Sequence, residues 1–226
     1  MEARTRGALV EAVRSHEVLV PAHGVMLPGT LEIGDHAFGV VLFAHGSGSS
    51  RLSPRNRYVA SVLQQAGLGT LLFDLLTDRE VEDRMNVFDI ALLADRLLSA
   101  VTFVTHDART AQCSLGVFGA STGAAAALLA AAREPRIHAV VSRGGRPDLA
   151  GDWLERVTAP TLFLVGGEDS EVLELNQRAL KRLRGPRQLT VIPGATHLFE
   201  EPGTLQQVAG LATQWFERQL PRGERP

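Results

Sequence analysis

The stretch that decides the fold is LGVFGASTGAAAALLAAARE, residues Leu115–Glu134. An apolar run ends in residues 119–123, GASTG, and an almost pure alanine segment, Thr122–Arg133, follows. Continuous apolar runs are typical of strands buried on both faces, and alanine has the highest helix propensity. The sequence therefore predicts a buried strand, a tight turn with a serine at its apex, and a helix.

The rest of the chain alternates in the same way. Two short strands, Glu17–Ala22 and Val25–Ile33, are expected to form an antiparallel hairpin across a His23–Gly24 turn. Continuous apolar runs predict buried strands over residues 39–45, 68–74, 114–119, 137–142, 160–166 and 188–194. Segments with one apolar face predict helices over residues 57–66, 86–104, 122–133, 171–183 and 204–220. Only a short helix, near residues 148–156, fits between the sixth and seventh strands.

This order predicts an α/β fold with a mostly parallel eight-stranded sheet, an N-terminal antiparallel hairpin, helices on both faces and no lid domain. At 226 residues we expect a single domain over residues 1–226, with an N-terminal extension at residues 1–16 and a frayed tail at residues 221–226. Ligands of such sheets bind at the carboxyl ends of the strands.

Composition and charge indicate the cellular compartment of the protein and exclude some classes of binding partner. A net charge of -2 and a pI near 6.4 give no basic field for nucleic acid or for an anionic membrane. The single Cys113 cannot form an intramolecular disulfide, and residues 1–16 lack the apolar core of a signal peptide. We therefore expect a cytoplasmic protein that binds neither nucleic acid nor membrane.

Residues 119–123 match the pattern G-x-S-x-G between a strand and a helix, which is the context of a nucleophile elbow. Glycine is needed on both sides of Ser121 because side chains there would collide with neighbouring elements. The helix after Ser121 also directs its amides and the positive end of its dipole at the serine. The alternative is that Ser121 only caps this helix.

A serine hydroxyl needs a general base, and the base needs an acid that orients it. In the chain order Ser, acid, His, the candidates are Ser121, Asp169 and His197, each placed after a predicted strand. Glu168 and Asp74 are competing acids, and Asp169 could instead be an ordinary helix cap. We expect Ser121, Asp169 and His197 to meet as a catalytic triad.

The loop FAHGSGSSRLSPRNR, residues 43–57, follows the third strand, where a second oxyanion donor is expected. The amide of Ser47, or alternatively of Gly46, would pair with the amide of Thr122. His45 and Gly46 are further candidates for substrate contact. The loop lacks the Gly-Lys-Ser/Thr ending of a P-loop, so nucleoside triphosphate binding is not expected.

Arginines follow two of these strands. Arg143 comes at a strand end, and Arg51, Arg55 and Arg57 follow the glycines of the expected oxyanion loop. One of them could clamp a substrate carboxylate. The alternative is that all four are solvated or capping arginines.

The chain resembles the α/β-hydrolase superfamily over nearly its full length. Residues 45–60 (HGSGSSRLSPRNRYVA), 71–77 (LLFDLLT) and 86–97 (NVFDIALLADRL) are similar to dienelactone-hydrolase-like proteins, a small lidless branch. Dienelactone hydrolases proper have a cysteine at the elbow, whereas this chain has Ser121, and Cys113 precedes the strand. A related group is joined to phosphoribosyltransferase domains, and no such domain is expected in this chain.

The resemblance implies a serine hydrolase that cleaves a small or water-soluble carboxylic ester or lactone through an acyl-enzyme. No cofactor is expected, and no metal, because the histidines lack metal-ligand spacing. Acyltransferases and perhydrolases use the same triad, and a binding module could keep the fold with little turnover. The oligomeric state stays open.

Overall fold

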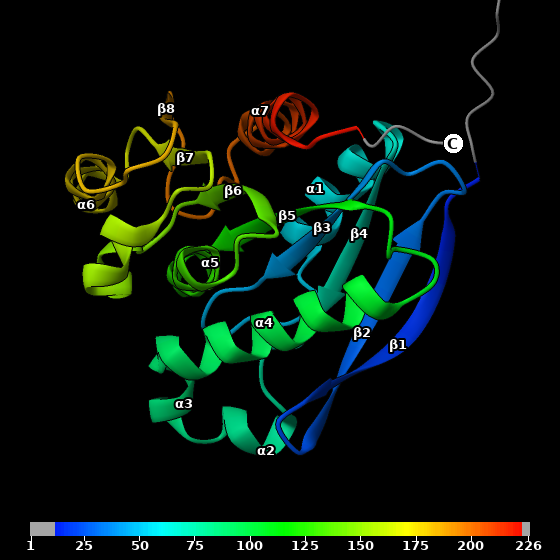
Figure 1. Cartoon of the computed structure of the whole chain (residues 1–226). Helices are drawn as coiled ribbons and strands as arrows, with labels where there is room; N and C mark the ends of the chain where they lie inside the picture. The colour runs from blue at the N-terminus through cyan, green and yellow to red at the C-terminus, as the bar shows by residue number, and fades with distance from the viewer. Residues whose placement is uncertain (1–11, 223–226) are drawn as a thin grey trace, which may run out of the picture.

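Eight strands form one sheet in the computed structural model, which describes residues 12–222 (Figure 1). They are β1 (Arg14–Ala22), β2 (Val25–Ile33), β3 (Gly39–Ala44), β4 (Leu68–Phe73), β5 (Ser114–Ala120), β6 (Ile137–Arg143), β7 (Thr161–Gly166) and β8 (Arg187–Ile192). Their order across the sheet is β1-β2-β4-β3-β5-β6-β7-β8. β2 pairs antiparallel with β1 and with β4, and all other neighbours are parallel. The predicted fold class is confirmed.

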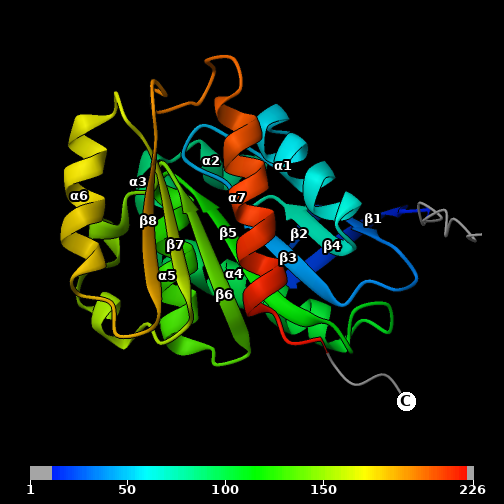
Figure 2. The same cartoon turned by 90° about the horizontal axis from the view of Figure 1, so that it is seen from above.

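Helices cover both faces of the sheet (Figure 2). On one face lie α1 (Pro54–Gln65) and α7 (Thr204–Gln219), which pack on Val41, Phe43 and Phe118. On the other lie α4 (Ile90–His106), α5 (Thr122–Arg133) and α6 (Ser170–Leu180). Between β6 and β7 the chain forms only a short 3₁₀ segment, η1 (Pro147–Arg156), which fits the expectation of no lid. No helix within residues 12–222 is long and apolar enough to cross a membrane.

The helix expected over residues 86–104 is wrong in one respect, because the structure divides it. α3 (Arg84–Phe88) ends at Asp89, and the Asp89 carboxylate accepts a hydrogen bond from the Leu92 amide to begin α4. A further short helix, α2 (Asp78–Val81), was not predicted. It begins with a capping box in which Thr77 and Glu80 each bond the backbone of the other.

The termini also differ from the expectation. β1 begins at Arg14, which is paired with Ile33, so residues 14–16 belong to the sheet and not to an extension. In the expected tail, the Pro221 carbonyl accepts a hydrogen bond from the Ser114 hydroxyl, and Arg222 lies over the Phe38 ring. The rest of both predicted segments, residues 1–11 and 223–226, lies outside the described residues.

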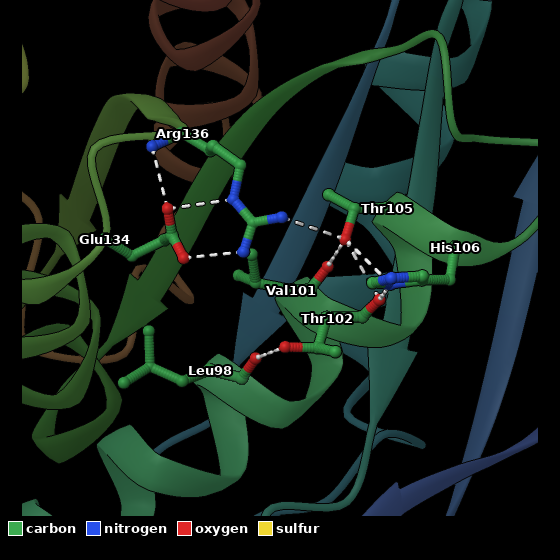
Figure 3. Close-up of polar contacts among 7 residues, drawn as sticks. All are labelled: Leu98, Val101, Thr102, Thr105, His106, Glu134 and Arg136. Carbon is green, nitrogen blue, oxygen red and sulfur yellow. Dashed lines mark hydrogen bonds and ion pairs between the residues drawn. The ribbon is translucent and has the colours of Figure 1, made fainter.

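Polar side chains tie α4 to the end of α5 at the amino-terminal edge of the sheet (Figure 3). The Arg136 guanidinium donates two hydrogen bonds to the Glu134 carboxylate, at 2.9 and 2.7 Å, and one to the Thr105 hydroxyl at 3.2 Å. These hydrogen bonds from Arg136 lower the pKa of Glu134. The far end of α5, the helix that follows Ser121, is therefore fixed against α4.

Candidate active site

The predicted site residues lie at one edge of the sheet. Strands β3 and β5 to β8 are parallel, so their carboxyl ends meet at the same edge, where α/β proteins bind ligands. The loops that follow these strands carry the elbow serine, the candidate acid and the candidate base.

Ser121 lies between β5 and α5 with φ 51° and ψ -122°, a conformation that residues with a side chain rarely adopt. A Cβ on Gly119 would lie 2.5 Å from the Ala124 Cα, and one on Gly123 would lie 2.2 Å from the Ala44 carbonyl oxygen. Both positions therefore require glycine. Ser121 is the residue before α5, but its hydroxyl makes no capping bond, so the capping alternative does not describe this serine.

The His197 Nδ1 and the Asp169 Oδ2 lie 2.7 Å apart and share a hydrogen bond. Asp169 precedes α6, yet its carboxylate makes no capping bond and is used for His197 instead. Of the competing acids, Glu168 is exposed and Asp74 binds the backbone amide and guanidinium of Arg51. Asp169 is thus the carboxylate that can orient His197.

Ser121 and His197 are linked through the end of β6. The Ser121 amide donates to the Arg143 carbonyl at 3.2 Å. A Cβ on the next residue, Gly144, would lie 3.5 Å from the His197 Cε1. No hydrogen bond within residues 12–222 joins the Ser121 hydroxyl to His197, and such bonds are often long without substrate.

The oxyanion loop lies directly against the elbow, since a Cβ on Gly46 would lie 2.9 Å from the Ser121 Cβ. The Ser47 amide donates to the Thr122 hydroxyl at 2.9 Å. The Thr122 amide is in the first turn of α5, where amides have no partner within the helix. Backbone amides of the loop and of α5 therefore lie beside Ser121. One of them, the Ser47 amide, already donates to an acceptor within the protein.

A small cavity of about 20 Å³ adjoins this loop, enough for about one water or one methyl group. Its walls are the loop residues 45–49, Thr122 and the apolar side chains of Leu76, Val81, Val87 and Leu93.

The structure corrects the expectation for His45. The side chain is buried, and its Nε2 accepts a hydrogen bond from the Leu75 amide at 3.1 Å. The protonated Nδ1 then donates to the Gly46 carbonyl at 3.1 Å, because an amide can only donate and thus fixes the tautomer. Burial lowers the pKa of His45 below its ordinary value of 6.5. Both ring nitrogens are engaged inside the protein, so His45 supports the loop and leaves no ring atom for a substrate.

Arg143 is 7% exposed and points to the face of the sheet that α1 and α7 cover, as Ala139 and Val141 do. Its Nε and Nη1 are buried and have no hydrogen-bond partner. Burial, with a smaller contribution from Arg55, lowers the pKa of Arg143 to about 10. The other candidate arginines differ: Arg51 is paired with Asp74, and Arg57 is exposed.

Two supporting residues were missed by sequence reasoning. The buried Asn176 of α6 donates to the Gly145 carbonyl at 2.9 Å and holds the loop after β6. Glu201 accepts hydrogen bonds from the amide and hydroxyl of Thr196 and holds the loop that carries His197. The short spacing from Thr196 to Glu201 is a usable signal, whereas nothing near Asn176 points to this role.

A groove of about 820 Å³ runs along α4, but none of the predicted site residues line it; Leu98, Thr102, Phe103 and His106 do. Within residues 12–222, no three His, Cys, Asp or Glu side chains are grouped so that they could hold a metal ion.

The model of the dienelactone hydrolase family matches residues 75–220, which is more than half of the chain. The chain belongs to the dienelactone hydrolase family. Consistent with this, the chain is 55% identical to a dienelactone hydrolase from Anabaena variabilis, with a TM-score of 0.90 over 92% of this chain and 99% of that one.

This dienelactone hydrolase family member is also similar to two curated proteins and to a solved esterase structure. It is 61% identical over 206 residues to proteins of two Mycobacterium tuberculosis strains named putative phosphoribosyl transferase, covering 90% of this chain and 46% of theirs. The chain thus spans about half of the length of those curated relatives. An esterase from Pyrococcus furiosus, 16% identical with a TM-score of 0.72 over 92% of each chain, shares the fold.

Proposed function

We propose that this protein is a serine hydrolase that cleaves small or water-soluble carboxylic esters or lactones through an acyl-enzyme on Ser121. His197 accepts the hydroxyl proton as Oγ bonds to the carbonyl carbon, and the same proton passes to the departing alcohol oxygen. Water then attacks the acyl carbon, His197 takes its proton and returns it to Ser121, and the acid is released. Asp169 orients His197 throughout.

The observation that carries this proposal is the use of the Asp169 carboxylate. It stands at a helix start, where a carboxylate usually caps the helix, but it bonds His197 at 2.7 Å instead. The same holds at the start of α5. Ser121 occupies the N-cap position there, but its hydroxyl makes no capping hydrogen bond and its backbone is strained. Ser121 and Asp169 both begin a helix without making the usual stabilising side-chain cap, and both lie near His197. This favours a catalytic role for the three residues.

Stabilisation of the oxyanion falls to backbone amides. The Thr122 amide at the start of α5 and the amide of Ser47, or of Gly46, would face the tetrahedral intermediate. Since the Ser47 amide donates to the Thr122 hydroxyl in the free protein, the incoming oxyanion has to displace or share that acceptor.

The short connection between β6 and β7 supports a small or water-soluble substrate. Only η1 lies there, so the connection adds no lid over the candidate site. The relative from Anabaena variabilis is named a dienelactone hydrolase, which fits an ester or lactone. We assign the hydrolase reaction to this segment, whose length is about half that of the relatives named phosphoribosyl transferases.

The test is labelling of the purified protein with a fluorophosphonate probe, followed by peptide mass spectrometry. We expect Ser121 to be labelled, and Asp169→Asn to lower both the labelling rate and kcat on 4-nitrophenyl acetate by on the order of 10³-fold to 10⁴-fold. The matched control is Glu168→Gln, which removes the neighbouring exposed carboxylate and should leave both rates unchanged.

The outcomes separate the assignments. Equal losses in Asp169→Asn and Glu168→Gln would contradict Asp169 as the orienting acid. A folded wild type that is not labelled at Ser121 would contradict the serine hydrolase and favour a binding module.

A further inference from the structure

The loop after β6, residues 143–146, holds Ser121 by both of its backbone groups. The Ser121 amide donates a hydrogen bond to the Arg143 carbonyl at 3.2 Å, and the Ser121 carbonyl accepts one from the Arg146 amide at 3.1 Å. Ser121 lies between these two bonds with φ 51°. A strained conformation of this kind persists only where the surrounding structure fixes it, so this loop is one of the supports of the elbow.

The same loop packs against His197. Gly144 has φ 50°, and a Cβ there would lie 3.2 Å from the His197 carbonyl oxygen and 3.5 Å from the His197 Cε1. Cε1 is the ring carbon between Nδ1, which is bonded to Asp169, and Nε2, the nitrogen that would accept the serine proton. A shift of residues 143–146 would therefore move Ser121 relative to the ring that has to reach its hydroxyl.

A single side chain fastens this loop to α6. Asn176 is fully buried, and its Nδ2 donates to the Gly145 carbonyl at 2.9 Å and to the Val172 carbonyl at 2.7 Å. In the part of the chain that the structure describes, residues 12–222, no other side chain forms a hydrogen bond with the backbone of residues 143–146.

The helix α6 carries the candidate acid as well as this amide. It begins at Ser170, directly after Asp169, and Asn176 follows seven residues after Asp169 (176 − 169 = 7). Seven residues are close to two turns of an α-helix, so the two side chains leave α6 on nearly the same side. One helix thus holds His197 through Asp169 and holds the loop that brackets Ser121 through Asn176.

Stability alone does not explain an amide at this position. The Asn176 Oδ1 is buried without a hydrogen-bond partner, and an unpaired buried acceptor is unfavourable. We propose that Asn176 is a positioning residue: by holding the Gly145 carbonyl it fixes residues 143–146, and with them the approach of the Ser121 hydroxyl to His197. The inference rests on the proposed function, in which His197 takes the proton of Ser121.

The test is the kinetics of Asn176→Leu. Leucine is similar in size to asparagine but cannot donate to the Gly145 carbonyl. We expect kcat on 4-nitrophenyl acetate to fall roughly 10-fold to 100-fold and KM to stay within about threefold, because the reacting groups are misplaced while the substrate still binds. Labelling of Ser121 by a fluorophosphonate should slow by a similar factor.

Two controls on the same helix separate position from stability. Gln177→Leu removes an amide from the next, exposed position and should keep both rates. Val172→Ala removes apolar contacts from a buried position, so it should lower the Tm as Asn176→Leu does but keep kcat. Asn176→Ser serves if Asn176→Leu folds poorly, because serine can bond the Val172 carbonyl of its own helix but is too short to reach Gly145. It should lose kcat as Asn176→Leu does.

Amide hydrogen exchange followed by NMR separates this inference from the proposed function. In Asn176→Leu the amides of Ser121 and Arg146 should exchange faster by roughly tenfold or more relative to amides in the middle of β5, which report the overall stability. If this ratio is unchanged, or if kcat falls equally in Val172→Ala, the positioning role is overturned and the hydrolase stands. If the ratio rises but the wild type neither hydrolyses esters nor is labelled at Ser121, Asn176 holds the loop and the proposed function fails.

Discussion

Ser121 has a backbone conformation that costs on the order of 1–3 kcal/mol for a residue with a side chain. The cost persists because Gly119 and Gly123 let β5 and α5 close around it. This conformation places the Ser121 side chain beside the loop that contains Gly46, and the hydroxyl makes no capping bond to α5. The strained backbone therefore lowers stability, and the hydroxyl that it positions is the one to which we assign the nucleophilic role.

Substitution at Ser121 can measure the cost of this conformation. Ser121→Gly should have a free energy of unfolding about 1 kcal/mol greater than Ser121→Ala, because only glycine adopts this conformation without strain. Both variants should be inactive on esters. Chemical denaturation of the two variants checks the difference, and equal unfolding free energies would show that the turn is unstrained.

The candidate triad could be predicted from local patterns, because Ser121, Asp169 and His197 each follow an apolar strand in a known order. The proximity of Arg55 and Arg143 could not, since it joins α1 to the end of β6, two elements that are far apart in the sequence. His45 was misjudged for the same reason. Its partner, the Leu75 amide, follows a different strand.

At the level of elements, the periodicity of apolar residues predicts the middle of a helix better than its ends. Val87, Ile90 and Leu93 continue one apolar face across Asp89, so the break between α3 and α4 is invisible to periodicity. The signal that marks it is the capping carboxylate of Asp89. The capping box of Thr77 and Glu80 similarly marks α2 in a stretch that has no amphipathic pattern.

The end of β3 and the loop after β4 are joined by the neutral ring of His45. Because burial lowers its pKa in the folded protein, the unfolded chain takes up a proton on His45 below pH 6.5 that the folded protein does not. The free energy of unfolding should therefore decrease as the pH falls from 6.5 toward the lower folded pKa. Above pH 6.5 this residue should contribute no pH dependence.

Thermal unfolding between pH 5 and pH 8 checks this tie between elements. His45→Gln should be less stable than the wild type at pH 8 but lose less stability on acidification. His23→Gln, at an exposed turn position, serves as the control and should keep the slope of the wild type. A slope unchanged in His45→Gln would mean that other groups cause the acid sensitivity.

On the scale of the whole molecule, one sheet runs through residues 14–192, and a separate core lies on each of its faces. Phe118 and Val117 are neighbours in β5 but belong to opposite cores, so neither core can be lost without exposing the strand between them. This arrangement favours unfolding as one cooperative unit, as the prediction of a single domain requires.

Differential scanning calorimetry tests whether the protein unfolds as one cooperative unit. We expect one thermal transition, with the calorimetric enthalpy equal to the van't Hoff enthalpy. Two resolved transitions would contradict the single domain, and they would indicate that β1 and β2 or the segment from β7 onward unfolds independently.

The short connection between β6 and β7 has a consequence for redesign. Gly151 divides η1 at φ 56°, is exposed, and has no neighbouring atom within 4 Å of where a Cβ would stand. Added chain at this position would emerge into solvent without displacing Ser121, Asp169 or His197. The molecule therefore offers a position at which an engineered segment could be inserted while the candidate site stays unaltered.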